Sequence, residues 1–260
     1  MLSELTTPFF VFLLSLARIM AIFRTAPFLG GNAVAGNVRN TVAITIVFLV
    51  YPIVQAQAPE TIVMSLHLGM LMAKEVLIGV IIGFLLGLLF WVAESTGFLI
   101  DNQRGAAMAS SVDPLSSNQS SPLGSVFFQA VVMLFFLSGA FVSFLGFLMQ
   151  SYSVWPVFSF IPNLESTALS DFIVSQVNVL ATAVVVLAGP ILILCFFSDF
   201  GLGLINRFAP QLNVFFLAMP VKSALAMFFL IIYTRVLMRI FKERIDSISP
   251  IYDLLQRIFQ

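Results

Sequence analysis

The sequence predicts an all-α membrane protein made of packed helical hairpins. Of the 260 residues, 60% are hydrophobic and 9% are charged, and the mean hydropathy is +1.07. Soluble globular chains carry about 25% charged residues, so much of this surface must avoid bulk water. We expect helices rather than strands because lipid offers no hydrogen-bond partner to an open strand edge.

Prolines, glycines, asparagines and charged residues divide the chain into about six apolar segments that we expect to be helical. They span 8–29, 40–54, 62–100, 122–150, 171–197 and 213–241. Three Ser/Thr-Pro pairs fit an N-cap followed by a proline whose missing N–H costs the first turn nothing. These pairs are Thr7-Pro8, Ser121-Pro122 and Ser249-Pro250.

The segment lengths do not match a simple bundle of spans. A bilayer core of about 30 Å needs about 20 residues per crossing. Segment 40–54 is short, whereas segment 62–100 would extend about 58 Å as a single helix. The long segment must therefore break, tilt strongly or project beyond the membrane.

Charge adds a conflict of parity. The last segment ends in a basic cluster that predicts a cytoplasmic C-terminus. The cluster consists of Arg235, Arg239, Lys242 and Arg244. Arg24 and Arg39 flank the first loop and predict that it is cytoplasmic too. A cytoplasmic first loop and a cytoplasmic C-terminus together need an odd number of membrane crossings, whereas six segments give an even number. Either segment 62–100 crosses twice, or some hairpins do not cross the membrane.

Several function classes are disfavoured. Twelve basic and twelve acidic residues cancel, which argues against a nucleic-acid partner. Cys195 and His67 are the sole residues of their types, so we expect no metal site and no cofactor. We expect no enzymatic activity, because no zinc-protease, nucleophile-elbow or phosphate-loop motif is present. We also expect no cleavable signal peptide, since Arg18 and Arg24 interrupt the first apolar stretch.

Glycines recur at a spacing of four in KEVLIGVIIGFLLG, at Gly79, Gly83 and Gly87. Small residues at this spacing let a second helix approach closely. The partner is either another subunit or a helix of the same chain, and the sequence does not decide between them. We hypothesise a seam between subunits.

Four charged residues lie in or beside apolar segments: Lys74, Glu75, Glu94 and Lys222. An ion in mid-membrane costs a few kcal/mol, so we expect each to be interfacial or paired. We expect Lys74 and Glu75 to open a helix as neighbours, whose side chains point about 100° apart. We therefore expect them to serve different partners.

Residues 101–122, DNQRGAAMASSVDPLSSNQSSP, join two long apolar segments and are rich in small residues. A connection of this length in a compact chain is usually functional or disordered. Non-helical backbone is tolerated at membrane depth only where protein covers it or water fills a cavity. The connection is either a pore loop or a plain surface loop.

We expect one helical domain, 1–242, followed by an amphipathic cytoplasmic tail, 243–260. Apolar residues of the tail recur at i, i+3, i+4 and i+7, at Ile251, Leu254, Leu255 and Ile258. This spacing gives one face of a short helix. Arg257 is balanced by Asp253, so we expect the tail to contact a protein partner rather than to anchor strongly in lipid.

Several stretches resemble the T subunit of the type III secretion export apparatus, the family of flagellar FliR and injectisome SctT. They are KEVLIGVIIGF at 74–84, ESTGFLIDNQRGAAMASSVDP at 94–114, GLGLINRFAPQLNVFFLAMPVK at 201–222 and ARIMAIFRTAPFLGG at 17–31. The similarity covers nearly the whole chain. The forms DNQRG and AMPVK resemble the injectisome branch more than the flagellar one.

The resemblance implies a core subunit of the export gate in the bacterial inner membrane. In this family the T subunit joins R and S subunits in a spiral assembly, part of which stands above the membrane on the periplasmic side. The implied partners are these subunits, a U-type switch protein on the cytoplasmic side, secreted unfolded polypeptides and membrane lipid.

The family's loop between its two central long helices helps to close the pore. Here it corresponds to about 105–122, with Asp101, Arg104 and Gly105 as its framework. The expected closing residues are Met108, Val112, Pro114 and Leu115. The resemblance thus implies a closable protein-secretion pore; the alternatives are a small-molecule permease or channel acting alone, and a membrane scaffold without a pore.

Overall fold

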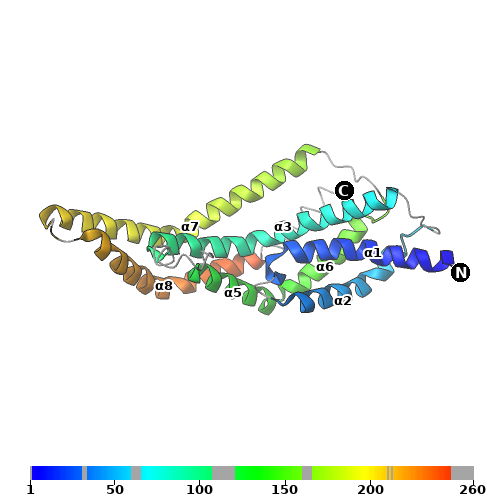
Figure 1. Cartoon of the computed structure of the whole chain (residues 1–260), viewed down its shortest axis with the longest axis horizontal. Coiled ribbons are helices and arrows are strands. Elements are labelled where there is room, and N and C mark those ends of the chain that lie inside the picture. The colour runs from blue at the N-terminus through cyan, green and yellow to red at the C-terminus, as the bar shows by residue number, and fades with distance from the viewer. Residues whose placement is uncertain are drawn as a thin grey trace. The chain divides into compact units, whose positions relative to one another are not determined.

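A computed structural model describes residues 2–30, 34–59, 66–106, 121–159, 166–209, 211 and 213–246. Every regular element in these ranges is a helix (Figure 1). In chain order they are α1 (Leu2–Thr25), η1 (Pro27–Leu29), α2 (Gly36–Gln55), α3 (Leu66–Gln103), α5 (Pro122–Leu137), α6 (Ala140–Val154), α7 (Ser166–Phe208) and α8 (Val214–Asp246). The all-α prediction is confirmed.

The chain forms two compact units. Unit 1 comprises Met1–Leu88, Phe136–Gln176 and Asp246–Gln260, and unit 2 comprises Leu89–Phe135 and Val177–Ile245. Helices α3, α5 and α7 each contribute residues to both units. The division is therefore one of packing, and the predicted single domain with a tail from 243 stays a prediction.

Unit 1 is centred on α1 and aromatic residues around it. Ile22 and Phe23 of α1 are fully buried. Phe28 of η1 is also buried and makes edge-to-face contacts with Phe136 and Phe144, at centroid distances of 6.4 and 5.9 Å. Such pairs add to the free energy of burying the rings themselves.

Unit 2 has its own aromatic core. Phe90 of α3 is fully buried and contacts Phe128 and Phe135 of α5, at centroid distances of 6.2 and 5.4 Å. Phe127 of α5 packs on Phe241 of α8 at 6.4 Å. Phenylalanines of α5 therefore pack against α3 and α8 in this core.

The N-cap predictions have mixed outcomes. Helix α1 begins at Leu2 and contains Pro8, so the predicted start at Thr7-Pro8 is wrong. Pro8 is the seventh residue of α1, so the helix continues through it with one backbone hydrogen bond fewer. Helix α5 does begin at Pro122, as predicted, and Ser249-Pro250 lies outside the described residues.

The predicted single segment 122–150 is wrong. Helices α5 and α6 are separate and bend by 73° at the break between them. Gly139 caps α6 with a φ of +78°, a backbone conformation that side-chain-bearing residues rarely adopt. The break therefore depends on glycine at this position.

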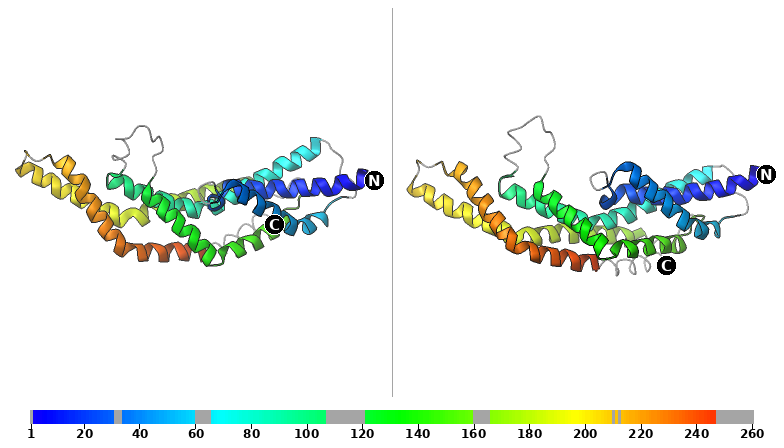
Figure 2. Two further views of the ribbon diagram at one scale, coloured as in Figure 1. Left: turned by 60° about the horizontal axis from the view of Figure 1, so that its bottom comes forward. Right: turned by 90° about the horizontal axis from the view of Figure 1, so that it is seen from below.

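Helices α7 and α8 are longer than predicted. Helix α7 continues to Phe208 instead of ending at 197, because Gly201 and Gly203 lie within the helix and do not end it. Helix α8 runs to Asp246, through the predicted tail boundary at 243. The two helices form an antiparallel pair in unit 2 (Figure 2), where the Tyr233 hydroxyl donates to the Leu187 carbonyl at 3.1 Å.

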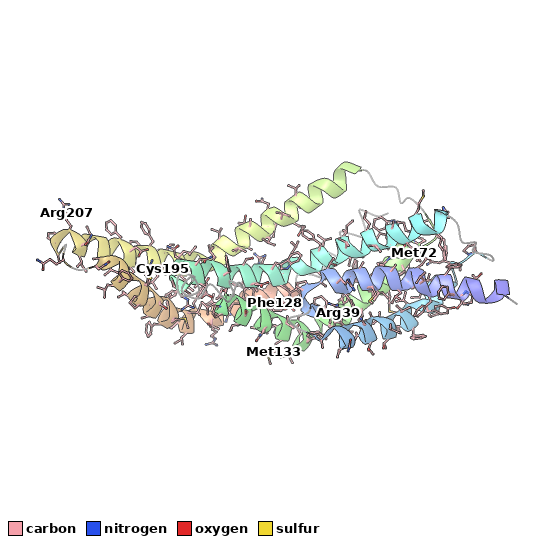
Figure 3. All side chains as sticks on the ribbon, viewed as in Figure 1. Arg39, Met72, Phe128, Met133, Cys195 and Arg207 are labelled. Carbon is pink, nitrogen blue, oxygen red and sulfur yellow. The ribbon has the colours of Figure 1, made fainter. Side chains whose placement is uncertain are left out.

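Within the described ranges, five helices are long and apolar enough to span a bilayer, and α5 with α6 could form one broken span more. Helix α3 is unbroken over 38 residues, about 57 Å at 1.5 Å per residue. The helices differ in how far they are covered: within one apolar 18-residue stretch of each helix, 61% is buried in α3 but only 11% in α8. Figure 3 shows side chains standing out from α7 and α8, with Arg207 near the end of α7.

Candidate functional site

Two groups of polar side chains lie inside the otherwise apolar units. We call them the Arg18 cluster (Arg18, Lys74, Glu75, Ser151 and Tyr152), in unit 1, and the Asp101 cluster (Asp101, Arg104, Ser121 and Ser223), in unit 2. In the described part of the chain, no three His, Cys, Asp or Glu residues come together as a metal site would require.

The Arg18 guanidinium is fully buried and every one of its N–H groups has an acceptor. Nε and Nη2 donate to the two oxygens of Glu75, at 2.6 and 3.1 Å. Nη1 donates to the carbonyl and hydroxyl oxygens of Ser151, and Nη2 donates to the Trp155 carbonyl. Five donors and five acceptors match the full capacity of arginine, so the charge is compensated without water.

Lys74 holds the turn that follows α6. Its Nζ donates to the carbonyls of Pro156, Val157 and Ser159 at 2.7–3.0 Å and lies 3.0 Å from Glu75 Oε1. Lys74 and Glu75 are the ninth and tenth residues of α3 rather than its first turn. The two neighbours have different partners, Arg18 for Glu75 and the carbonyls after α6 for Lys74, and the long lysine stem also lets its ammonium reach the adjacent carboxylate.

Tyr152 completes the Arg18 cluster. The Arg18 guanidinium lies over its ring, 4.1 Å from the centroid, where the negative face of the ring attracts a cation. The Tyr152 hydroxyl donates to the Ser15 carbonyl at 3.0 Å, and Gln57 Nε2 donates to the Tyr152 carbonyl at 3.1 Å. The cluster thereby joins α1, α3, α6 and the residues after α2.

Asp101 of α3 lies at the start of α5. Its side chain is 4% exposed, and Oδ2 accepts from the Ser121 hydroxyl at 2.6 Å and from the Leu123 backbone N–H at 2.9 Å. Ser121 Oγ in turn accepts from the Gly124 N–H at 2.9 Å. Pro122 has no N–H, and the N–H groups of Leu123 and Gly124 both have acceptors, so these first-turn donors of α5 are satisfied. The carboxylate also lies at the positive end of the helix dipole.

The same carboxylate connects to α8. Asp101 Oδ1 accepts from Arg104 Nε at 2.7 Å, and Arg104 Nη1 donates to the Ser223 hydroxyl of α8 at 3.1 Å. Gly105 has a φ of +89°, and a Cβ added there would meet Met219 of α8 at 3.4 Å. All three predicted framework residues therefore lie at the junction of α3, α5 and α8.

Glycines allow the ends of α3 and α5 to touch backbone to backbone. A Cβ at Gly97 would overlap the Gly124 backbone and lie 2.5 Å from the Leu123 carbonyl carbon. Contacts this short essentially never occur for real side chains, so only glycine fits. The approach brings Asp101 within hydrogen-bonding distance of α5.

The predicted closing residues Met108, Val112, Pro114 and Leu115 lie outside the described residues. Their role stays a prediction. The described residues on either side, up to 106 and from 121, are those of the Asp101 cluster and its neighbours.

The predicted glycine seam packs inside unit 1. A Cβ at Gly79 would lie 2.5 Å from the Arg18 carbonyl oxygen, and one at Gly83 would overlap the Thr25 hydroxyl. Gly87 is buried. Helix α1 occupies the space that the first two glycines leave, so the intramolecular alternative left open by the sequence accounts for them.

The remaining two predicted charges differ. Lys222 of α8 pairs with Asp199 of α7, with Nζ 3.0 Å from Oδ1 and side chains 15% and 40% exposed. Glu94 is exposed on α3. The expectation of pairing holds for Lys222.

The sequence also indicates a buried ion pair at Arg18, which was not among the predicted site residues. An arginine inside an apolar helical segment is rare and normally has a buried partner, but Arg18 was used only to argue against a signal peptide. No role was predicted for Asp199. No local pattern indicated Tyr152 or Ser223, because their partners are 137 and 119 residues away.

Comparison with known proteins gives the family. Residues 9–248 match the family described as Bacterial export proteins, family 1. The Yop proteins translocation protein T of Yersinia pestis is 44% identical over 227 residues, 87% of this chain and 86% of the relative. The surface presentation of antigens protein SpaR of Shigella flexneri is 36% identical, covering 83% of this chain and 81% of the relative.

A flagellar relative is more distant than these two. The flagellar biosynthetic protein FliR of Bacillus subtilis is 29% identical over 222 residues, 85% of each chain. The predicted family and its injectisome branch are both supported. The chain belongs to the bacterial export proteins, family 1, and is a multi-pass inner-membrane protein of the type III secretion export apparatus.

Proposed function

We propose that this chain is the T subunit of a type III secretion export gate and forms, with R and S subunits, a closable pore for unfolded polypeptides. The uncovered surface of α7 and α8 carries the proposal. Large apolar side chains there are more than half exposed, among them Phe196, Phe197, Phe200, Phe228, Ile231 and Ile232.

Lipid alone does not account for this surface. The Asp199 carboxylate is 40% exposed within the apolar α7 span, and an ion facing hydrocarbon is costly. A surface that mixes exposed phenylalanines with a half-exposed ion pair suits companion subunits better than lipid tails. As the T subunit, the chain would belong to a spiral assembly, part of which is raised into the periplasm.

The basic end of α8 supports a cytoplasmic C-terminus. A U-type switch protein on that side is the proposed partner of this end. Energy for export would come from other components of the apparatus.

The pore role is tested at the 105–122 connection. Deleting residues 108–115 should make liposomes that contain the assembled complex leaky to ions, because the proposed closing residues are removed. Replacing residues 116–120 with a glycine-serine stretch of equal length should leave them tight. Unchanged permeability of the deleted complex contradicts the gate.

A permease acting alone is the second candidate, because such a protein would carry paired charges within its helices, and Arg18–Glu75 and Lys222–Asp199 are such pairs. In the Arg18 cluster, however, the N–H donors of Arg18 and Lys74 are bonded to protein groups. No donor is left for a solute. Purifying the protein after expression with and without its neighbouring genes distinguishes the two candidate functions, since a permease would be active as a single chain in detergent.

A further inference from the structure

We propose that Asp101 is a positioning residue that clasps the two ends of the 105–122 connection and links them to α8. The proposal rests on the proposed gate function and assigns its control to described residues on either side of the connection. It predicts that loss of the Asp101 carboxylate opens the complex even when every residue of the connection is present.

The first step is that one carboxylate bridges both ends. Asp101 precedes the connection on α3, and its Oδ2 accepts from Ser121 and Leu123, which follow the connection, at 2.6 and 2.9 Å. A hydrogen bond to an ionised acceptor is stronger than a neutral one. The two ends therefore cannot separate without breaking two such bonds.

The second step is burial. Asp101 is 3% exposed as a residue, so water can replace its partners only if the junction opens. A buried carboxylate without its donors is costly. The clasp should consequently be either fully made or fully broken, with few intermediate arrangements.

The third step is the link to α8. Arg104 joins Asp101 Oδ1, at 2.7 Å, to the Ser223 hydroxyl of α8, at 3.1 Å. Ser223 directly follows Lys222, which pairs with Asp199 of α7. Displacement of α8 along its own axis would therefore pull on Arg104 and, through it, on the carboxylate that holds the start of α5.

The test measures ion leak per assembled complex in liposomes, with co-purification as the measure of assembly. Asp101→Asn keeps the side-chain shape but loses the charge, and it should raise the leak about tenfold, near the low end for loss of a bond to a charged group. Asp101→Glu should restore part of the closure, because it keeps the charge. Ser121→Ala and Ser223→Ala should each raise the leak less, since each removes one bond.

Glu94→Gln is the matched control. It removes an exposed carboxylate of the same helix, seven residues before Asp101, and it should leave the complex tight. A merely structural Asp101 would lower the yield of complex without raising the leak of the complexes that form.

The outcomes separate the clasp from the gate. If the complex that lacks residues 108–115 leaks, but assembled Asp101→Asn complexes are as tight as wild type, the proposed role of Asp101 is wrong and the proposed gate stands. If neither leaks, the gate itself fails and the clasp with it. Should Asp101→Asn not assemble, the Ser121→Ala and Ser223→Ala complexes decide, and wild-type tightness of both overturns the proposal.

Discussion

The Arg18 cluster and the Asp101 cluster use similar charges for different purposes. In unit 1, Arg18 and Lys74 donate mainly to backbone carbonyls between 151 and 159, and Arg18 is fully buried. In unit 2, Asp101 accepts from a helix start and from an arginine that reaches a serine. The Arg18 cluster therefore ties the backbone after α6 to α1 and α3, whereas the Asp101 cluster ties the start of α5 to a side chain of α8.

The largest expected effect is that of Arg18→Met. The variant leaves Glu75 buried with Lys74 as its remaining cation and removes donors from Ser151 and Trp155. Breaking one side of a buried ion pair costs about 3–5 kcal/mol. We expect the free energy of unfolding of the chain, measured in detergent by denaturant titration, to fall by that amount.

The double variant Arg18→Met/Glu75→Gln is the control for this effect. It removes both charges of the pair and should be more stable than Arg18→Met alone, because the buried carboxylate that has lost its bonds to Arg18 is removed as well. An unfolding curve for Arg18→Met that matches wild type means that the Arg18 cluster does not lock unit 1, and the contrast with unit 2 is lost.

Gly83→Leu should have the next largest effect. The new side chain would overlap Thr25 of α1, and overpacking typically costs about 1–3 kcal/mol. The thermal midpoint of the purified chain should fall. Gly69→Leu is the matched control on the same helix, because no atom lies within 4 Å of a Cβ placed there, and it should melt close to wild type.

The same variant sharpens the comparison of packing inside unit 1 with packing between subunits. Loss of co-purification by Gly83→Leu with an unchanged melting curve of the isolated chain would restore the intersubunit seam. A lowered melting temperature of the isolated chain supports intramolecular packing against α1.

The smallest effect is expected for Asp199→Asn. The pair with Lys222 is partly exposed, with the carboxylate side chain at 40%, and exposed pairs contribute about 0.2–1 kcal/mol. The thermal midpoint of the isolated chain in detergent should barely change. A loss comparable to that of Arg18→Met would show that exposure does not distinguish the ion pairs of the two units.

Local sequence was a good guide where neighbouring residues decide the structure. The predicted start of α5 is correct because Ser121 and Pro122 act within one turn. The serine hydroxyl accepts from the Gly124 N–H. The break at Gly139 was missed because a glycine inside an apolar run is compatible with a continuous helix as well as with a bend. The opposite error concerns Gly201 and Gly203: the predicted segment ends at 197, before these glycines, but α7 continues through them.

By itself the sequence determined the helical class, the approximate apolar segments and the family, because these depend on composition, local patterns and long matching stretches. Only the tertiary structure decided the partners. Arg18 meets Glu75 across 57 positions and Ser151 across 133, and Gly83 meets Thr25 of α1. Hydropathy reports how apolar a helix is, but which helix lies against it depends on packing between residues far apart in the chain.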